Sequence, residues 1–310
     1  MAILIVHLDR KTQRTVQRIL GATGYRVEVA DDLEQGMRLL QHIAPRLVVV
    51  DGSALSSPSA APFFAAVRAR HAEACMMLIG AKTLDQIPHL LELRAITNLL
   101  VHPMPVLAEE LTITAHKLVR NDLFGAEKYL LWGTELHERV VTHSAQRQQI
   151  VTDLAQVIRG GGQSARVASM AMLVADELIS NAVHNAPCDA GGHHYRSEVA
   201  RDTDLELDPA HQVRLRWGCD ARYFAIEVTD RFGSLDRGTI LSSLAKQDVR
   251  ESGGGAGMGV VLSYRSCDHL IFNLAPGKRT EVIALIDVRS PPTDTTRSSA
   301  SFNVFVESSP

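Results

Sequence analysis

The chain has 310 residues, a net charge of −3 and an isoelectric point near 6.5, so nothing in its charge favours a nucleic acid or a membrane surface as partner. Apolar residues make up 45% and charged residues 22%, the balance of a globular protein of about two domains. The sequence has no run of about 18 apolar residues that would predict a transmembrane helix, and its N-terminus lacks the features of a signal peptide. We therefore expect a cytoplasmic protein.

The four cysteines are far apart in the sequence and show no paired spacing. This favours reduced thiols over disulfides or a zinc site. Cys188, His193 and His194 are ligand-type side chains in one short stretch, but their spacing matches no recognised metal motif. We interpret this stretch as a polar loop.

Residues 1–122 alternate apolar runs with amphipathic stretches, which indicates strands and helices in turn. Five strand–helix pairs predict a doubly wound parallel sheet with right-handed crossovers, and hence an α/β domain. The predicted strands are 2–6, 25–30, 46–51, 75–80 and 98–103. The predicted helices are 10–24, 31–43, 61–71, 84–95 and 105–121.

A junction over 123–133 precedes a second predicted domain, 134–289, in which helices pack on a mixed, mainly antiparallel sheet as an α+β sandwich. Its predicted strands are 134–141, 212–219, 223–230, 268–274 and 280–288. Its predicted helices are 145–160, 164–187 and 260–267. The tail, 290–310, begins as a polar linker and ends in an apolar run long enough for one edge strand, on this chain or on a partner.

Glu177 and Asn181 stand one helical turn apart on the same face of a predicted helix. A carboxylate and an amide placed in this way can hold a water and a magnesium ion, because magnesium takes oxygen ligands and keeps several of its waters. An ordinary solvent-facing pair is the alternative.

Three further stretches carry polar residues or glycines at chain turns. Asp230 ends a predicted strand, where it can accept a hydrogen bond from an exocyclic amine, and Gly233 lets the backbone approach a ring. The stretch "ESGGGAGMG" (251–259) precedes a helical run, so its free N–H groups can face a polyphosphate; a flexible linker is the alternative. Thr280 enters a strand after Gly277.

In this order, the four stretches resemble the N, G1, G2 and G3 boxes of the GHKL ATPase superfamily, which has the Bergerat-type fold. The resemblance covers about residues 134–288 and implies ATP and Mg²⁺ as ligands. It makes Glu177 the catalytic glutamate and Asn181 the magnesium ligand. The other matching positions would bind the nucleotide: Asp230 and Gly233 at the adenine, Gly255, Gly257 and Gly259 at the phosphates, and Thr280 in the last box.

The G1 box departs from the Asp-x-Gly pattern of the superfamily, because Gly233 comes one place late. Arg231 and Phe232 are therefore expected at the mouth of the pocket, and residues 233–253 would form its lid. The compact layout resembles the anti-sigma-factor serine kinases, which phosphorylate a serine of an anti-anti-sigma partner. It leaves no room for the long phosphoacceptor helices of a histidine kinase, and His137 falls in a predicted strand.

Residues 2–120 resemble a response-regulator receiver domain, with Asp51 at the position of the phosphoacceptor. Other residues of the receiver site are replaced: His7 and Leu8 stand for the acidic pair, Gly80 for the Ser/Thr, and His102 for the lysine before Pro103. Because a magnesium site needs the missing carboxylates, we interpret the domain as a pseudo-receiver that regulates or docks. A working receiver and a pH-sensitive contact of Asp51 with the two histidines are the alternatives.

Together the two resemblances imply a bacterial signal-transduction protein, an ATP-dependent serine/threonine kinase of the anti-sigma-factor type regulated by a degenerate receiver. Its partner would be a STAS-type anti-anti-sigma protein or another signalling protein, and a second copy of the chain is a further candidate. One alternative is a non-catalytic regulator that binds nucleotide or only protein. Another is a hybrid histidine kinase, which needs a phosphoacceptor helix that we do not find in the sequence.

Overall fold

The computed structural model describes residues 1–71, 75–79, 96, 98–101, 107–189, 191–201, 203–245, 258–289 and 301–307. The chain divides into two compact units, Met1–Leu123 with Asn303–Pro310 (unit 1) and Phe124–Phe302 (unit 2). The division falls inside the last strand, β11 (Ser301–Val306). Among the described residues, no helix is long and apolar enough to cross a membrane.

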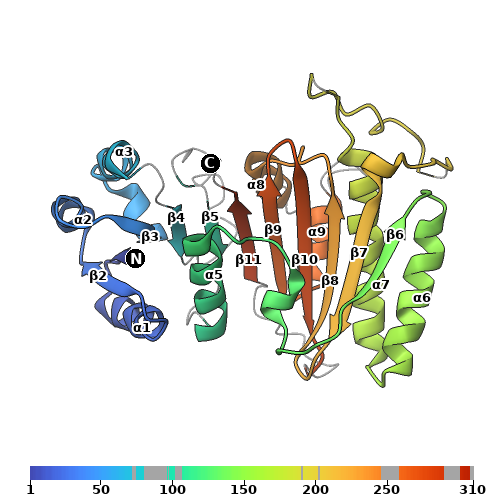
Figure 1. The fold of residues 1–310 in the computed structure, drawn as a ribbon, viewed down its shortest axis with the longest axis horizontal. Coiled ribbons are helices and arrows are strands. Elements are labelled where there is room, and N and C mark those ends of the chain that lie inside the picture. Colours follow the sequence, from blue (N-terminus) through green and yellow to red (C-terminus); the bar gives the residue numbers. More distant parts are fainter. Residues whose placement is uncertain are drawn as a thin grey trace. The chain divides into compact units, whose positions relative to one another are not determined.

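Unit 1 contains a parallel sheet with helices on both faces (Figure 1). Its strands are β1 (Ala2–Val6), β2 (Arg26–Ala30), β3 (Pro45–Asp51), β4 (Cys75–Ile79) and β5 (Asn98–Val101). Helices α1 (Arg10–Gly21) and α5 (Ala108–Arg120) lie on one face, and α2 (Leu33–Leu39) and α3 (Ala60–Arg70) on the other. The order β2-β1-β3-β4-β5 is that of flavodoxin-like folds, so the predicted doubly wound architecture is confirmed. The predicted helix 84–95 lies outside the described residues.

The elements of unit 1 follow from local features of the sequence. Residues 3–6 and 47–50 are wholly apolar and almost fully buried, as strands covered on both faces must be. Asp9 caps α1, because its carboxylate accepts a hydrogen bond from the backbone N–H of Thr12 (2.8 Å). The carboxylate of Asp32 does the same for α2, where it accepts a hydrogen bond from the N–H of Gln35 (2.7 Å). These caps pair backbone donors that a helix leaves free at its start.

The predicted C-terminal strand is present as β11 and lies beside β5 in the strand order. The side-chain amide of Asn303 donates to Oε1 of Glu110 in α5 (2.9 Å), and both side chains are buried. The backbone N–H of Val306 donates to Oδ1 of Asn98 (3.1 Å). Side-chain hydrogen bonds therefore hold the end of the tail in unit 1, and Phe305 is fully buried there.

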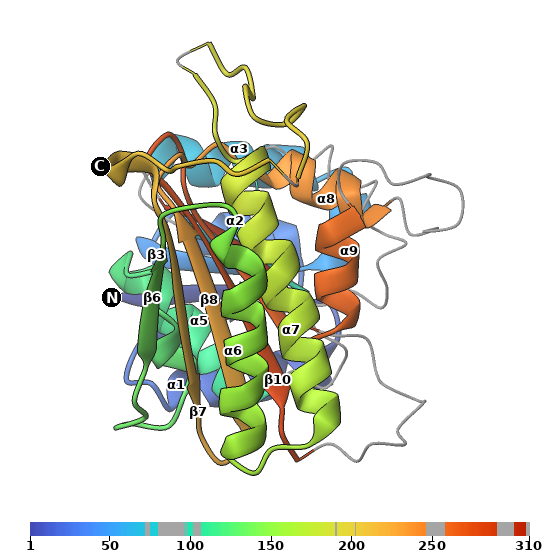
Figure 2. The same ribbon diagram turned by 90° about the vertical axis from the view of Figure 1, so that its right-hand side faces the viewer.

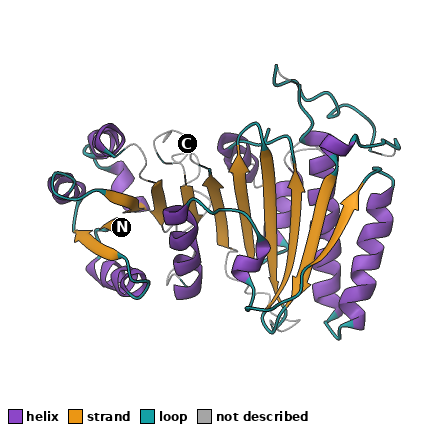
Figure 3. Ribbon diagram, in the orientation of Figure 1, coloured by secondary structure: helices purple, strands orange, loops and turns teal. Residues whose placement is uncertain are grey.

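Unit 2 packs helices on a sheet whose order is β9-β10-β8-β7-β6, with antiparallel neighbours throughout. The strands are β6 (His137–Val141), β7 (Val213–Cys219), β8 (Tyr223–Asp230), β9 (His269–Ala275) and β10 (Arg279–Asp287). The helices are α6 (Gln146–Gly160), α7 (Ala165–Ser180), α8 (Arg237–Ala245) and α9 (Met258–Arg265). Figure 2 shows α6, α7 and α9 on one face of this sheet. Helices packed on an antiparallel sheet are the architecture that the sequence predicts (Figure 3).

Ser164 caps the start of helix α7, because its hydroxyl accepts a hydrogen bond from the N–H of Val167 (3.3 Å). It continues beyond its last residue as one π-helical turn, Asn181–Asn185, in which the N–H of Ala186 donates to the carbonyl oxygen of Asn181 (2.9 Å). Single π turns interrupt helices frequently at functional sites.

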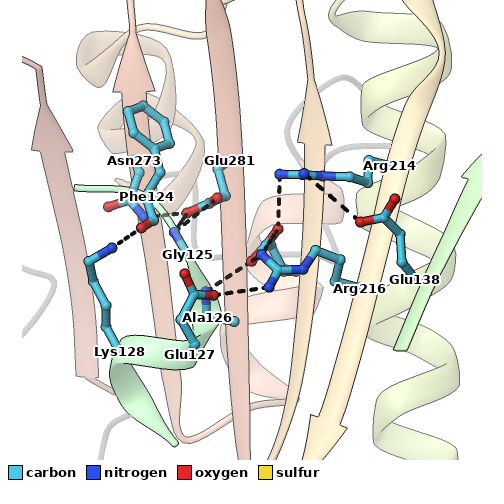
Figure 4. Close-up of polar contacts among 11 residues, drawn as sticks. Phe124, Gly125, Ala126, Glu127, Lys128, Glu138, Arg214, Arg216, Asn273 and Glu281 are labelled. Carbon is cyan, nitrogen blue, oxygen red and sulfur yellow. Dashed lines mark hydrogen bonds and ion pairs between the residues drawn. The ribbon is translucent and has the colours of Figure 1, made fainter. Parts of the chain in front are cut away.

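The predicted junction contains a short 3₁₀ helix, η3 (Ala126–Tyr129), which packs on the face of the unit 2 sheet that α7 and α9 leave open (Figure 1). The backbone N–H of Ala126 donates to Oε2 of Glu227 in β8 (2.9 Å), and that of Gly125 donates to Oε1 of Glu281 in β10 (2.9 Å) (Figure 4). Both carboxylates are fully buried. We call these four residues the junction clamp.

Cations and amides surround the junction clamp (Figure 4). Nη1 of Arg216 lies 3.1 Å from Oε2 of Glu227, and Nη2 of Arg214 lies 3.5 Å from Oε1. The side-chain amide of Asn273 donates to Oε1 of Glu281 (2.7 Å). Partners of this kind are what a buried carboxylate requires, because an unpaired charge in the interior is costly.

Candidate functional site

Three of the predicted nucleotide-site residues meet at the end of α7. Glu177 lies in the last turn of α7, and Asn181 begins the π turn. A Cβ atom added to Gly259 would lie 2.4 Å from Oε2 of Glu177 and 3.1 Å from Nδ2 of Asn181. The backbone at the start of α9 therefore approaches both side chains so closely that any side chain at this position would displace them.

The raised pKa of Glu177 is that of a side chain able to accept a proton. Burial raises the pKa of this half-buried carboxyl above its ordinary value, while the positive charges of Arg201 and Arg147 act in the opposite direction. A carboxylate with a raised pKa is a stronger base, as general base catalysis near neutral pH requires.

Asn181 has an oxygen that can bind a cation. Its Oδ1 accepts a hydrogen bond from the side-chain amide of Asn185 (2.7 Å), which leaves a second lone pair. Among the described residues, no group of three His, Cys, Asp or Glu side chains is placed to hold a metal ion. A magnesium ion at Asn181 would therefore depend on phosphate oxygens and water for its other ligands, which is usual for this ion.

If the predicted nucleotide site is correct, Gly259→Ala should weaken nucleotide binding while the fold stays stable. The new methyl group would meet the end of a flexible carboxylate, which can turn away, and alanine is the better helix former. The affinity for Mg·ATP should fall about tenfold, the effect of one lost polar contact, as measured by calorimetry. Gly160→Ala is the matched control, because its Cβ atom would meet nothing within 4 Å. Equal affinities in the two variants would remove Gly259 from the site.

The second group of predicted residues lies where β8 ends beside the start of β10. Asp230 and Thr280 are directly opposite in the register, so their side chains share one face of the sheet. Gly233 has a φ of 60°, and its Cβ atom would lie 2.4 Å from the carbonyl oxygen of Ala275. The N–H of Gly277 donates to the carbonyl oxygen of Gly233 (3.0 Å). Only glycine fits here, and it joins the end of β8 to the turn before Thr280.

Asp230 is a buried carboxyl group with 5% of its surface exposed. Burial raises its pKa to about 6, although the N–H groups of Phe232 (2.9 Å) and Gly233 (3.2 Å) donate to its Oδ1 and act in the opposite direction. The side chain and the backbone of Thr280 also act to lower the pKa of Asp230. Carboxyl groups with a pKa raised by burial are typical of functional sites.

One hydrogen bond links the two groups, because the hydroxyl of Ser234 donates to the carbonyl oxygen of Ala186 (2.7 Å), directly after the π turn. Helix α7 also packs on both β8 and β10. The group of Glu177, Asn181 and Gly259 is thus connected through Ser234 and α7 to the group of Asp230, Gly233 and Thr280. The predicted residues Gly255 and Gly257 lie outside the described part of the chain.

The structure shows what Phe232 contacts. Its side chain is buried and stacks on His211, with ring centres 4.5 Å apart and planes 20° from parallel. The ring points toward the short helix η5 (Pro209–His211), whereas the neighbouring Arg231 is exposed. The segment expected to form the lid contains α8, a helix that was not predicted.

Two other stretches of unit 2 have local structural roles. His137 lies in β6, as predicted, and its ring centre is 5.6 Å from that of Trp217 on the neighbouring strand. In the polar stretch after α7, the carboxylate of Asp189 accepts hydrogen bonds from the N–H groups of Gly191 and His193 (both 2.9 Å). This closes a turn.

In unit 1, Asp51 ends β3 and His7 follows β1, so the two lie at the carboxyl ends of neighbouring strands. Nε2 of His7 lies 3.7 Å from Oδ1 of Asp51. The backbone N–H of Asp9 donates to Nδ1 of His7 (3.0 Å), so Nε2 carries the hydrogen of the neutral ring and faces Asp51. The hydroxyl of Ser53 also donates to Asp51.

The carboxylate of Asp9 caps α1, as described above, so it serves the helix rather than Asp51. A histidine thus occupies the place where a receiver would bring an acidic residue to Asp51. Gly80 and His102, the other predicted replacements, lie outside the described residues.

No protein-family model and no curated protein matches this sequence. Solved structures similar to the chain include the receiver domain of NtrX from Brucella abortus (20% identity, TM-score 0.34), with 39% of this chain and 99% of that one covered. Another is the chemotaxis response regulator CheY4 of Vibrio cholerae (18% identity, TM-score 0.32, 38% of this chain and 97% of that one). A third is a response regulator from Thermotoga maritima (17% identity, TM-score 0.33, 38% and 97%).

Proposed function

We propose that this chain is a bacterial signal-transduction regulator whose unit 2 binds Mg·ATP and transfers a phosphoryl group to a serine or threonine of a partner protein. The observation that supports this most is the meeting of Glu177, Asn181 and Gly259 at the end of α7. It puts a carboxylate, an amide and the start of α9 within reach of one another. On the proposal these supply the base, the magnesium ligand and the phosphate-binding N–H groups that phosphoryl transfer needs.

Each residue of the site has a role on this proposal. Asp230 and Thr280 bind the adenine, and Asn181 binds the magnesium ion. Mg·ATP supplies the phosphoryl group when it is bound. Glu177 orients the attacking hydroxyl and accepts its proton. The free N–H groups at the start of α9, next to Gly259, offer donors to the phosphates.

Unit 1 acts on this proposal as a pseudo-receiver. The contact of Asp51 with His7, together with the use of Asp9 as a helix cap, supports regulation or docking over phosphorylation of Asp51. The partner would be a STAS-type anti-anti-sigma protein or another signalling protein.

The test is transfer of labelled phosphate from ATP to a STAS-type protein by the full-length chain. We expect Glu177→Gln to reduce the transfer rate about a hundredfold or more, because general base catalysis typically contributes that much. Its affinity for Mg·ATP should change little, since the amide has the same shape. The control is Glu198→Gln, an exposed residue in the segment after α7. Equal rates for wild type and Glu177→Gln would overturn the role of Glu177.

A non-catalytic nucleotide-binding regulator is the second candidate function. The hydrogen bond that Asn185 donates to Oδ1 of Asn181 favours it, because that bond competes with a magnesium ion for the same oxygen. Binding of ATP without transfer to a STAS-type protein, and with the same affinity with or without magnesium, would select this function.

A further inference from the structure

The segment between the π turn and β7 returns to the start of α6 (Figure 2). The hydroxyl of Ser144, just before α6, donates to the carbonyl oxygen of Thr203 (2.9 Å) and accepts the N–H of Leu205 (2.8 Å). Since Arg201 precedes Thr203 by two residues and Arg147 lies in the first turn of α6, this attachment brings the two arginines to the same end of the helix.

Arg147 also reaches α7. Its Nη1 lies 3.0 Å from Oδ2 of Asp176, the residue before Glu177. Among the described residues, no carboxylate forms an ion pair with Arg196 or Arg201.

Two buried polar atoms at this place lack a partner. His184, in the π turn, is 3% exposed, and its Nδ1 has no hydrogen-bond partner among the described residues. Burial lowers the pKa of His184, and the charges of Arg201, Arg147 and Arg196 act in the same direction. Nη1 of Arg196 is buried and also has no partner in the described part of the chain.

A buried guanidinium N–H without an acceptor is costly, and an anion removes that cost. Guanidinium groups match the oxygens of a phosphate, to which they can donate two parallel hydrogen bonds. Because Nη1 of Arg196 is buried, a small anion can reach it more easily than an acidic side chain of a partner protein bound at the surface. A small anion is therefore the favoured ligand.

We propose that Arg147, Arg196 and Arg201, with His184, form a phosphoryl-binding site next to Glu177 and Asn181. It receives the terminal phosphate of a nucleoside triphosphate. The inference rests on the proposed function, because Glu177 and Asn181 are the residues that place the nucleotide. It assigns the segment after α7 a role in distinguishing a triphosphate from a monophosphate.

The test is calorimetry on the full-length chain with Mg²⁺ and three probes: ATP, AMP and inorganic pyrophosphate. We expect Arg196→Gln and Arg201→Gln each to weaken ATP and pyrophosphate binding about tenfold, the effect of one charge-assisted hydrogen bond. The affinity for AMP should stay within about twofold. Arg159→Gln, an exposed arginine in the last turn of α6, is the control and should change none of the three. Arg196→Lys, which keeps the charge, should recover part of the loss.

Other outcomes would overturn the inference in distinguishable ways. Unchanged ATP affinity in both variants would exclude the arginine site and leave the proposed function intact. Equal losses for ATP and AMP would show that the arginines support the fold or the adenine site instead. A wild-type chain that binds none of the probes would overturn both the arginine site and the proposed function.

Discussion

Glu227→Ala is expected to lower the free energy of unfolding of unit 2 by about 3–5 kcal/mol, the usual effect of removing one partner of a buried ion pair. Glu227 is fully buried, pairs with Arg216 and accepts the N–H of Ala126. Its loss leaves the N–H of Ala126 without its acceptor and leaves Arg216 with only the more exposed of its two carboxylate partners, Glu127. Both tryptophans, Trp132 and Trp217, lie in unit 2, so urea unfolding followed by fluorescence measures this unit.

Glu138→Ala is the matched control for this variant. Glu138 lies 3.9 Å from Arg214 but is half exposed, so its ion pair should contribute no more than about 1 kcal/mol. Fluorescence midpoints that are equal in the two variants would mean that the junction clamp does not stabilise unit 2.

The junction clamp could not be predicted from the sequence. In the stretch "YFAIEVTD", Glu227 alternates with apolar residues, which is also the pattern of a strand with one face in water. Its partner Ala126 is 101 residues away in the chain, and Gly125 is 156 residues from Glu281. Nothing local distinguishes a carboxylate that binds backbone N–H groups in the interior from one that binds water.

Other features could be predicted from the sequence because they depend on the spacing of residues that are close together in the chain. The apolar runs gave the five parallel strands, and the four-residue spacing of Glu177 and Asn181 placed both on one side of α7. The sequence could not predict which way the side chain of Phe232 points. It depends on the hydrogen bonds of Asp230 to the chain after it and on the ring of His211, which comes from another part of unit 2.

Asp230→Asn is expected to stabilise unit 2 at pH 8 by up to about 3 kcal/mol, because the pKa of Asp230 is raised to about 6 from an ordinary value of 3.8. Between these two values the folded protein holds a proton that the unfolded chain releases, so the stability of the wild type falls as the pH rises. Asparagine has no charge to bury, and its oxygen can still accept the N–H groups of Phe232 and Gly233. Fluorescence-detected urea unfolding from pH 4 to pH 8 measures the difference.

The advantage of the variant should shrink to less than about 1 kcal/mol near pH 4, where Asp230 is protonated in the folded state and the pH is close to the ordinary pKa of 3.8 of the unfolded chain. A difference that stays constant with pH would exclude the burial of charge as its cause. Asp153→Asn in α6 is a control in which the expected change in stability has the opposite sign. Hydrogen bonds from Gln149 and Arg139 lower the pKa of Asp153, so this variant should be the less stable protein above the ordinary pKa of an aspartate.

Carboxyl groups with a pKa raised by burial are frequent at ligand sites, and on the proposed function the ligand of Asp230 is the adenine of ATP. An exocyclic amine that donates a hydrogen bond to Asp230 favours the ionised form and so lowers its pKa. Saturating ATP should therefore shift the pH dependence of wild-type stability toward lower pH and leave the profile of Asp230→Asn unshifted. If ATP stabilises both proteins equally at every pH, the nucleotide does not reach Asp230.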